Sequence, residues 1–414
     1  MIALFIHQNF PGQYRHIVRH LADSPDNTVY FITQPNNNEM MGVEKVTYTI
    51  PPIPPLNCHP FTVDFDVAVR HGMAVVDACR QLAARGVRPD IICGHSGWGE
   101  LLFVKDVFAD APILSYFEFY YHLNDADVGF DKEFPVHPAA PFRLRAKNAV
   151  NLLSFDAVDW GNAPTRWQRS VHPPELRSRI SVLHEGVDTQ LVKPEPGAWI
   201  SLKRYSARLT RSDEVVTYVA RNLEPYRGFH SFMRAAREIL LRRPRTHIVV
   251  VGGDGVSYGV PPPDGRPYRQ VMLDELGLRN EDRLHFLGQI PHETYVNLLQ
   301  VSSAHVYLTY PFVLSWSFIE AMAAGCAVVG SATPPVLEIL KDGENGLAVD
   351  FFSPTAIADK VDEILDSPDR RQDLRDAART TAVRDFDLKT KTLPRWTALI
   401  DDLINGRRPT GIAD

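Results

Sequence analysis

The sequence predicts an α/β protein made of two Rossmann-like, doubly wound domains, each built around a parallel sheet. Short apolar runs that fit buried strands alternate with amphipathic segments that fit helices, and this alternation produces parallel sheets. A chain of 414 residues is too long for one ordinary core, and the proline-rich residues 193–197 separate two such halves. We therefore expect domains over residues 1–193 and 200–385, followed by a helical tail over residues 386–408.

Composition narrows the class of protein. Apolar content of 44% and charged content of 23% are typical of a soluble globular protein, and no apolar run reaches the roughly 18 residues that span a bilayer. The apolar N-terminus lacks the basic region of a signal peptide. We expect a cytoplasmic protein without integral membrane association. No metal site is expected, because no C-x-x-C spacing joins the four cysteines, Cys58, Cys79, Cys93 and Cys326.

Charge argues against a polyanionic partner. The net charge is −6, and residues 1–190 carry 16 basic and 21 acidic side chains. A domain that docks on nucleic acid or anionic lipid usually presents a basic face. Nucleic acid is therefore not expected as a partner, and a membrane-bound ligand is mildly disfavoured.

The first predicted domain opens with a strand, a glycine turn and a helix. The apolar strand over residues 2–7 runs into Gly12, which would let the turn pass close to a ligand, and a helix follows over residues 13–22. A second strand is expected over residues 29–33. Residues 34–60 are polar and rich in proline, so we expect no regular structure there, and the segment is either a candidate lid or an ordinary surface loop.

Polar side chains follow the next strands of this domain. After a helix over residues 63–85, a strand over residues 89–94 leads to His95 and Trp98, and a strand over residues 112–115 leads to Glu118 and Tyr120. The carboxyl ends of parallel strands meet at one edge, which is where ligands bind. We therefore expect His7, His95 and Glu118 to lie together. Taken singly, each histidine fits a hydrogen-bonded structural role, and the aromatic residues 116–121 fit a core. A further strand is expected over residues 151–154.

The second predicted domain opens with a strand and a turn that carries two arginines. Arg221 and Arg227 lie six residues apart in the turn after the strand that begins at Val215. Arginine offers permanently charged, bidentate donors that suit a diphosphate. The alternative is a pair of solvated surface charges. Further strands are expected over residues 246–251, which end in Gly252, Gly253 and Asp254, and over residues 283–287, which lead to Gly288 and Ile290.

The stretch 305–331 has the clearest pattern in the chain. An apolar strand over residues 305–310 leads through a loop to a short helix over residues 317–324, and another strand follows. A helix N-terminus after a strand is a ready anion site. Glu320, expected in the first turn, could accept hydrogen bonds from two vicinal hydroxyls. Spacing alone favours the alternative, a capping box in which Glu320 bonds back to Ser317.

A family resemblance reverses that preference. Glu320, Ala321, Met322, Ala323 and Gly325 resemble the E-x7-E…A-M-A-x-G donor signature of the retaining glycosyltransferases of family 4. The turn from Arg221 to Gly228 resembles the family's G-R-L-x-x-x-K-G phosphate loop, with Arg227 where lysine is usual. Phe312 stands where the first motif glutamate would contact the donor sugar.

The resemblance implies the GT-B fold, in which two Rossmann-like domains face each other across a cleft and the last helix crosses back to the first domain. It also implies a retaining, metal-independent transfer of a sugar from a UDP- or GDP-sugar, without a cofactor. Arg221, Arg227, Glu118 and His95 are then the candidate catalytic residues. The implied acceptor-binding residues are His7, Trp98, Glu118 and Tyr120. The implied donor-binding residues are Gly12, Gln13, Arg221, Arg227, Gly252, Gly253, Asp254, Gly288, Ile290, Leu314, Ser315, Trp316, Ser317 and Glu320.

Several alternatives stay open at this point. Glu118 could be a positioning residue, a base or a nucleophile, because a retaining enzyme can use a carboxylate close to the reacting bond. The acidic profile favours a small soluble acceptor such as a specialised metabolite over a polysaccharide or a lipid-linked acceptor. A nucleotide-sugar epimerase and a non-catalytic nucleotide-binding homologue are the other candidate functions, and a homo-oligomer is compatible with all of them.

Overall fold

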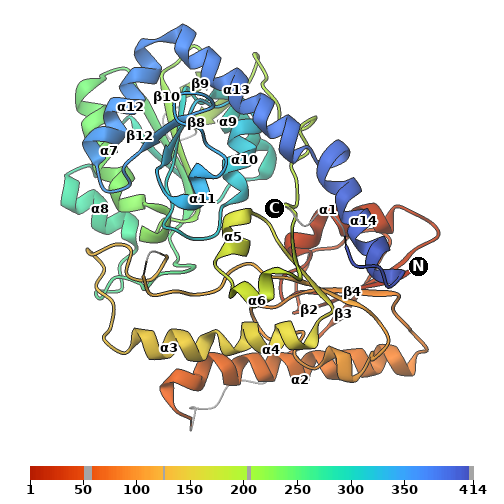
Figure 1. Ribbon diagram of the computed structural model, residues 1–414. Helices are drawn as coiled ribbons and strands as arrows, with labels where there is room; N and C mark the ends of the chain where they lie inside the picture. Colours follow the sequence, from red (N-terminus) through yellow and green to blue (C-terminus); the bar gives the residue numbers. More distant parts are fainter. Residues whose placement is uncertain (51–57, 125, 203–206, 410–414) are drawn as a thin grey trace. The chain divides into compact units, whose positions relative to one another are not determined.

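The computed structural model describes residues 1–50, 58–124, 126–202 and 207–409, and it divides the chain into two compact units. One unit comprises Met1–Gly186 and Leu388–Asp414, and the other comprises Val187–Asp387. Each unit is a doubly wound α/β fold, which confirms the predicted fold class (Figure 1). Within the described residues, no helix is long and apolar enough to cross a bilayer.

The first unit is built on a seven-stranded parallel sheet. Its strands, in spatial order, are β3 (Val43–Thr47), β2 (Thr28–Thr33), β1 (Ile2–Ile6), β4 (Ile91–His95), β5 (Ile113–Tyr116), β6 (Trp160–Ala163) and β7 (Ile180–Val182). Its helices are α1 (Arg15–Ala22), α2 (Val63–Ala84), α3 (Ala140–Lys147), α4 (Ala149–Ala157), α5 (Arg166–Ser170), α6 (Pro174–Arg177) and α14 (Leu393–Ile404).

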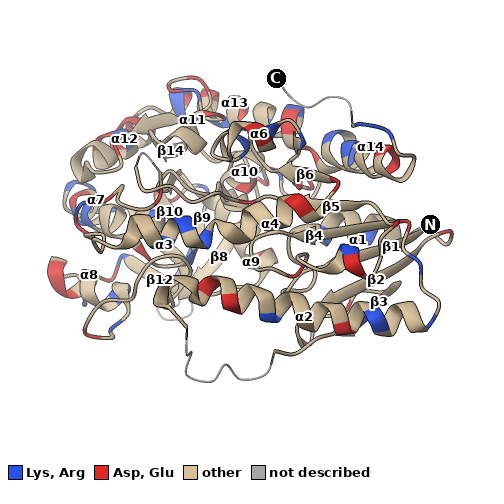
Figure 2. Ribbon diagram, turned by 60° about the horizontal axis from the view of Figure 1, so that its bottom comes forward, with Lys and Arg blue, Asp and Glu red and all other residues tan. Residues whose placement is uncertain are grey.

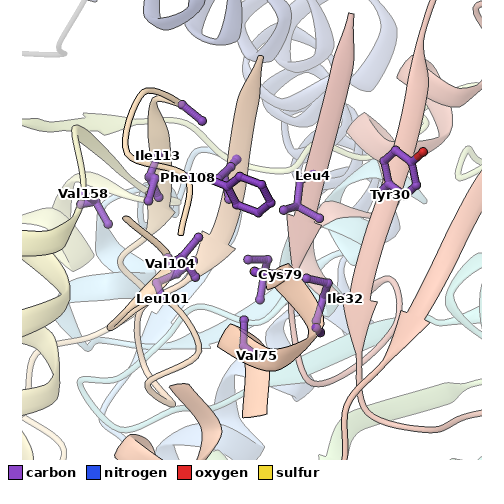
Figure 3. Packing of buried hydrophobic residues seen from close by; sticks show 14 of the residues in the cluster. Leu4, Tyr30, Ile32, Val75, Cys79, Leu101, Val104, Phe108, Ile113 and Val158 are labelled. Carbon is purple, nitrogen blue, oxygen red and sulfur yellow. The ribbon is translucent and has the colours of Figure 1, made fainter. Parts of the chain in front are cut away.

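Both faces of this sheet are buried, which is why β1 reads as a continuous apolar run. Leu4 and Ile6 belong to the core beneath α2, whereas Ala3 and Phe5 belong to the core beneath α1 and α14. Figure 3 shows the first of these cores, where Val75 and Cys79 of α2 pack against β1 and β2. Fully burying such aliphatic side chains contributes about 1.5–3 kcal/mol each. Figure 1 shows α2 and α4 on one side of the sheet and α1 and α14 on the other.

The second unit is built on a six-stranded parallel sheet and a two-stranded antiparallel hairpin. The sheet order is β12 (Leu284–Gly288), β11 (His247–Gly253), β10 (Val215–Asn222), β13 (Ala304–Tyr307), β14 (Val328–Ser331) and β15 (Leu347–Val349), and the hairpin is β8 (Trp199–Leu202) and β9 (Ala207–Thr210). The helices are α7 (Phe229–Arg242), α8 (Tyr268–Leu276), α9 (His292–Val301), α10 (Trp316–Ala323), α11 (Pro334–Leu337), α12 (Pro354–Asp366) and α13 (Pro368–Phe386).

Two expectations about local structure were wrong. Residues 151–154, predicted as a strand, lie inside α4, and the strand is β6. A short apolar run does not distinguish a strand from a helix, and Val150 and Ser154 face inward with helical spacing while Leu152 and Leu153 are exposed. Residues 34–60 were expected to lack regular structure, yet β3 pairs with β2 as an edge strand. Its charged residues are tolerated because edge strands face solvent. Residues 51–57 of the candidate lid lie outside the described residues.

Charged side chains of both signs lie on the outer helices. Figure 2 shows acidic and basic residues along α2 and α7. Several are paired one turn apart, such as Arg70 with Asp66 and Arg242 with Glu238. Exposed pairs of this kind contribute about 0.3–0.5 kcal/mol each, so they favour solubility more than stability.

The loop after β4 packs directly on α2 through a glycine. A Cβ at Gly99, where φ is +91°, would lie 2.3 Å from the Ala68 carbonyl oxygen, and a Cβ at Gly72 would lie 2.9 Å from the Gly99 carbonyl oxygen. This close contact between Gly99 and α2 sets the position of the loop that carries Trp98.

We expect Gly99→Ala to destabilise the protein more than Gly86→Ala. Gly86 has a similar φ of +83° but no atom within 4 Å of a built Cβ, so it isolates the backbone strain of about 1–2 kcal/mol. The clash at residue 99 adds about 1–3 kcal/mol. Equilibrium denaturation of both variants measures the difference, and equal losses of stability would contradict the close approach.

Candidate functional site

The order of strands in the second sheet reverses between β10 and β13. From β10 the chain builds outward through β11 and β12, then returns to the other side of β10 as β13. In doubly wound folds a ligand binds beyond the carboxyl ends of the strands at this switch point. The turns after β10, β11, β12 and β13 carry the donor residues predicted in this unit, and the fold brings those turns to one edge of the sheet.

Arg227 joins the two sides of the switch point. Its Nη1 donates hydrogen bonds to Thr309 Oγ1 at 2.9 Å and to the Val313 carbonyl oxygen at 2.8 Å, both in the segment after β13. The residue is 8% exposed. Burial alone would lower its pKa, but the neighbouring Tyr307 and Tyr258 and a hydrogen bond with Tyr258 raise the pKa above its ordinary value. Arg227 is thus a fixed, permanent cation at the switch point.

Arg221 is placed differently. It lies near the end of β10 with an exposed side chain, and no hydrogen bond or ion pair holds it within the described part of the chain. The two arginines predicted to bind phosphate therefore differ. Arg227 is held by the fold, whereas the exposed Arg221 can adjust to a ligand.

The glycines after β11 allow the neighbouring turn to approach closely. A Cβ at Gly252 would lie 2.7 Å from Leu223 Cδ2, and a Cβ at Gly253 would lie 2.6 Å from Asn222 Oδ1. Larger residues would push the turns after β10 and β11 apart. Asp254 forms an ion pair with Arg269 at 2.5 Å. Gly288 ends β12 with φ of +65°, and Ile290 is partly buried against the core.

The N-terminus of α10 differs from the expected capping box. Ser315 is the N-cap and accepts from the Ser317 amide at 3.4 Å, and the Ser315 amide donates to Tyr307 Oη at 2.8 Å. These two amides, expected to face a phosphate, already have acceptors inside the fold. Leu314 is buried and Trp316 is 38% exposed. The helix begins at Trp316, so Glu320 lies in the second turn and does not cap it.

Glu320 bonds instead to the neighbouring helix α9. Its Oε2 accepts from Tyr295 Oη at 2.8 Å, and its Oε1 lies 3.4 Å from His292 Nε2. The side chain is 18% exposed. These contacts hold the carboxylate at the edge of the sheet while leaving part of it open to solvent, an arrangement that suits hydroxyl recognition.

The first sheet also reverses its order, between β1 and β4, and a histidine follows or ends each of these strands. The rings of His7 and His95 lie 5.5 Å apart and perpendicular. His7 Nδ1 accepts from the Asn9 amide at 2.9 Å, and His95 Nδ1 accepts from the Gly97 amide at 2.9 Å. When Nδ1 accepts, the proton of a neutral imidazole lies on Nε2. Both rings therefore present Nε2–H as a donor.

Glu118 lies beside these two donors, after β5. Its Oε2 is 3.6 Å from His95 Nε2, and its Oε1 accepts from Gln13 Nε2 at 3.3 Å. Burial alone would raise its pKa, but the interactions with His95 Nε2 and with the Gln13 side-chain amide lower the pKa below its ordinary value. The carboxylate is thus ionised at neutral pH. The fold places His7, His95 and Glu118 together, as their positions after adjacent strands predicted.

The other predicted residues of this unit divide into two groups. Gly12, where φ is +55°, lies flat on His7, since a Cβ would be 2.7 Å from the ring. Trp98 stacks on His95 with ring centroids 4.0 Å apart. Tyr120, by contrast, contacts His122 and His172, with centroids 5.5 and 5.9 Å away.

Sequence reasoning missed two buried acids near these clusters. Glu100 is fully buried beside Tyr48, whose hydroxyl donates to Glu100 Oε1 at 3.2 Å, and burial raises the pKa of Glu100 to about 7. Glu224 is 1% exposed, and its carboxylate accepts hydrogen bonds from three backbone amides of the loop after β11, those of Ser257, Tyr258 and Gly259. In the sequence Glu224 lies between Arg221 and Arg227, and a carboxylate between two cations in one turn is the pattern that indicates it.

Models of glycosyltransferase families match most of the chain. Residues 25–192 match the glycosyl transferase family 4 group, and residues 203–381 match the glycosyl transferases group 1. The D-inositol 3-phosphate glycosyltransferase of Corynebacterium glutamicum (strain R) is 29% identical over 193 residues, which are 47% of this chain and 45% of that protein. Spore coat protein SA of Bacillus subtilis (strain 168) is 24% identical over 222 residues, 51% of this chain and 56% of that protein. The chain thus aligns to about half the length of these curated relatives.

Solved structures show the same fold over almost the whole chain. Sucrose-phosphate synthase from Thermosynechococcus elongatus superposes with a TM-score of 0.71 at 19% identity, covering 98% of this chain and 99% of that one. Anabaena Alr3699/HepE, solved in complex with UDP-glucose, superposes with a TM-score of 0.69 at 16% identity, covering 98% and 100%. Two Rossmann-like domains of this kind define the GT-B fold. The fold agrees with the two family matches, which show that the chain belongs to the family 4 glycosyltransferases.

We expect His7 to make the folded protein less stable as the pH falls. Burial, together with the charge of His95, lowers the pKa of His7 from 6.5 to about 3. Between these values the unfolded chain binds one more proton than the folded protein, so stability falls as pH falls, by about 1.4 kcal/mol per pH unit. His7→Asn, whose amide oxygen replaces the Nδ1 acceptor, should reduce the slope of unfolding free energy against pH between 6.5 and 4. The exposed His20 gives the control variant His20→Asn, and equal slopes in the two variants would contradict the assignment.

Proposed function

We propose that this chain is a retaining, metal-independent glycosyltransferase that moves a sugar from a nucleoside-diphosphate sugar to an acceptor hydroxyl. The observation that carries the proposal is the buried Arg227 cation at the switch point of the second sheet, with Arg221 in the same turn. Family membership and the fold shared with Anabaena Alr3699/HepE, solved with UDP and with UDP-glucose, support it.

The donor half of the site fits a nucleoside diphosphate. Negative charge grows on the diphosphate as the sugar leaves, and prepositioned cations stabilise it at the least cost. Arg227 supplies such a cation, and Arg221 can close on the second phosphate. Glu320 is the candidate acceptor for the ribose hydroxyls, with Tyr295 and His292 holding its carboxylate. The guanidiniums would take the place that a divalent metal occupies in other transferases.

The cluster in the first unit fits a hydroxyl-bearing ligand. A hydroxyl needs both a donor and an acceptor, and the cluster offers Nε2–H groups from His7 and His95 beside the ionised Glu118. Because both imidazoles are fixed as donors, neither is suited to remove a proton. We assign Glu118 to positioning, and the leaving phosphate then takes the acceptor proton on the same face of the sugar.

The proposed acceptor is a small soluble molecule such as a specialised metabolite. The mixed charge of α2 and α7 (Figure 2) favours it over a carrier in an anionic lipid surface. Incubation with a UDP- or GDP-sugar and candidate acceptors, followed by product analysis, tests the reaction. Donor hydrolysis or transfer supports a transferase. An epimerised nucleotide sugar formed without acceptor, or nucleotide binding without turnover of any donor, would overturn it.

We expect Arg227→Ala and Arg221→Ala to weaken binding of UDP or GDP by about 10- to 100-fold each, since a charged hydrogen bond is worth about 1.5–3 kcal/mol. Isothermal titration measures the affinities. Arg384, whose partner is the adjacent Asp385 on α13, provides the control variant Arg384→Ala. Equal nucleotide affinity in all three variants would contradict the assignment of Arg221 and Arg227 to phosphate binding.

We expect Glu118→Gln to reduce kcat/KM by about 10- to 100-fold without trapping a covalent sugar, because a neutral amide of the same shape keeps one acceptor oxygen. A nucleophilic carboxylate would instead give complete loss of activity or an adduct. Steady-state kinetics and intact-mass spectrometry after incubation with donor distinguish the two. A glycosyl adduct on the wild-type chain at Glu118 would show that the positioning role is wrong.

A further inference from the structure

A buried carboxylate holds the loop after β11 against the turn after β10. Oε1 of Glu224 accepts a hydrogen bond from the Ser257 amide at 2.9 Å. Oε2 accepts hydrogen bonds from the amides of Tyr258, at 3.1 Å, and Gly259, at 2.9 Å. Hydrogen bonds accepted by a carboxylate are about twice as strong as those between neutral groups. Three consecutive residues of the loop are therefore tied to the turn that carries Arg227.

Close packing adds to this attachment. Asn222 Nδ2 donates a hydrogen bond to Ser257 Oγ at 2.7 Å. A Cβ at Gly259 would lie 3.4 Å from Glu224 Oε2 and 3.5 Å from Tyr226 Cδ2, which is ordinary van der Waals contact. The backbone of the loop thus packs directly on the turn.

The attached loop places an aromatic ring beside a buried cation. The guanidinium carbon of Arg227 lies 5.4 Å from the centroid of the Tyr258 ring and 5.8 Å from that of the Phe312 ring. The two rings lie 4.8 Å apart and are inclined by 60°. A cation within about 6 Å of an aromatic centroid is attracted to the ring, and the attraction is larger when the pair is shielded from water. Arg227 is 8% exposed, so water screens this attraction little.

The ring supplies a constraint that the two hydrogen bonds of Arg227 to the segment after β13 do not. Nη1 donates to Thr309 Oγ1 and to the Val313 carbonyl oxygen. Because both bonds start from one nitrogen, they fix one point of the guanidinium and leave the plane of the group to be set by other contacts. Phe312 lies on the same segment as these acceptors, whereas Tyr258 approaches from the loop after β11, on the other side of β10.

We propose that Glu224 is a positioning residue for diphosphate binding. By holding the loop after β11, it places the Tyr258 ring beside Arg227, and the ring sets the plane in which the guanidinium meets a phosphate. This inference rests on the proposed function, because it takes Arg227 as a diphosphate-binding group. A guanidinium presents its donors in a planar fork, so its plane decides where those donors point. A group that is already oriented loses less conformational freedom when the ligand binds.

The first test is isothermal titration of UDP and GDP into the full chain and its Tyr258 variants. Tyr258 is 37% exposed, so the side chain can be removed without opening the core. We expect Tyr258→Ala to weaken binding about three- to tenfold, and Tyr258→Phe, which keeps the ring, to stay within twofold of the wild type. The matched control is Trp199→Ala, which removes a ring that lies 4.4 Å from the Arg208 guanidinium in the β8–β9 hairpin, and its affinity should equal that of the wild type. Tighter binding in Tyr258→Ala, or equal losses in Tyr258→Phe and Tyr258→Ala, would overturn the role of the ring.

The role of Glu224 needs a second substitution. Glu224→Gln replaces one acceptor oxygen by an amide nitrogen that cannot accept a hydrogen bond, so the loop loosens and binding should weaken by no more than in Tyr258→Ala. In the Tyr258→Ala background the same substitution should change affinity by less than twofold, because the ring that Glu224 positions is already gone. Equal effects of Glu224→Gln in both backgrounds would show that Glu224 does not act through Tyr258.

The Arg227→Ala background tests whether the ring acts through the cation. Tyr258→Ala should change affinity there by less than twofold, because the guanidinium that the ring orients is absent. A ring that only stabilises the fold would weaken binding in both backgrounds, and that result would overturn the inference. Wild-type binding that Tyr258→Ala leaves unchanged would overturn this inference alone, whereas absence of nucleotide binding in the wild type would overturn the proposed function with it. Thermal unfolding of each variant confirms that the compared proteins are folded.

Discussion

The candidate donor site of the second unit depends on one guanidinium that is held on both sides of a topological switch. Arg227 follows β10, yet its Nη1 bonds to the segment after β13, and parallel pairing of these two strands sets the distance it must cross. Gly228, where φ is +67°, lets the chain leave the turn immediately, since a Cβ there would lie 2.4 Å from Leu308 Cβ. The phosphate assignment and the contact between the guanidinium and the Tyr258 ring both depend on this placement.

In the first sheet, backbone amides fix the orientation of the functional side chains. His7 and His95 are each followed two residues later by an amide that donates to Nδ1, and His184 after β7 repeats the pattern with Gly186. Each amide that would be unpaired at a strand exit is satisfied by the adjacent ring. The same bond fixes the tautomer, so the local need to satisfy the backbone determines what the ring offers to a ligand.

Much of the fold could be predicted from periodicity because both sheets are parallel and buried on both faces. Apolar runs that contain β-branched residues, such as residues 2–6 and 248–251, favour strands, whereas the mixed sequence of α4 fits a strand or a helix equally well. The alignment of His7, His95 and Glu118 followed from topology alone. The contacts of Glu320 with α9 and of Glu224 with residues 257–259 did not, because each joins segments whose separation in space depends on helix packing and on loop path.

Arg221 and Arg227, the two arginines of the turn after β10, differ in how firmly the fold holds them, and this difference bears on the proposed catalysis. A charge that stabilises a transition state is most effective when it is already oriented, because reorientation would otherwise raise the barrier. Arg227 meets this condition through its two hydrogen bonds and its burial, and Arg221, exposed and unrestrained within the described residues, does not. Under the proposed function, Arg227 is therefore the group suited to the leaving phosphate, and Arg221 is suited to capture of the donor. The Tyr258 ring, whose centroid lies 5.4 Å from the guanidinium carbon, adds a cation–π contact that helps to hold this buried charge in place.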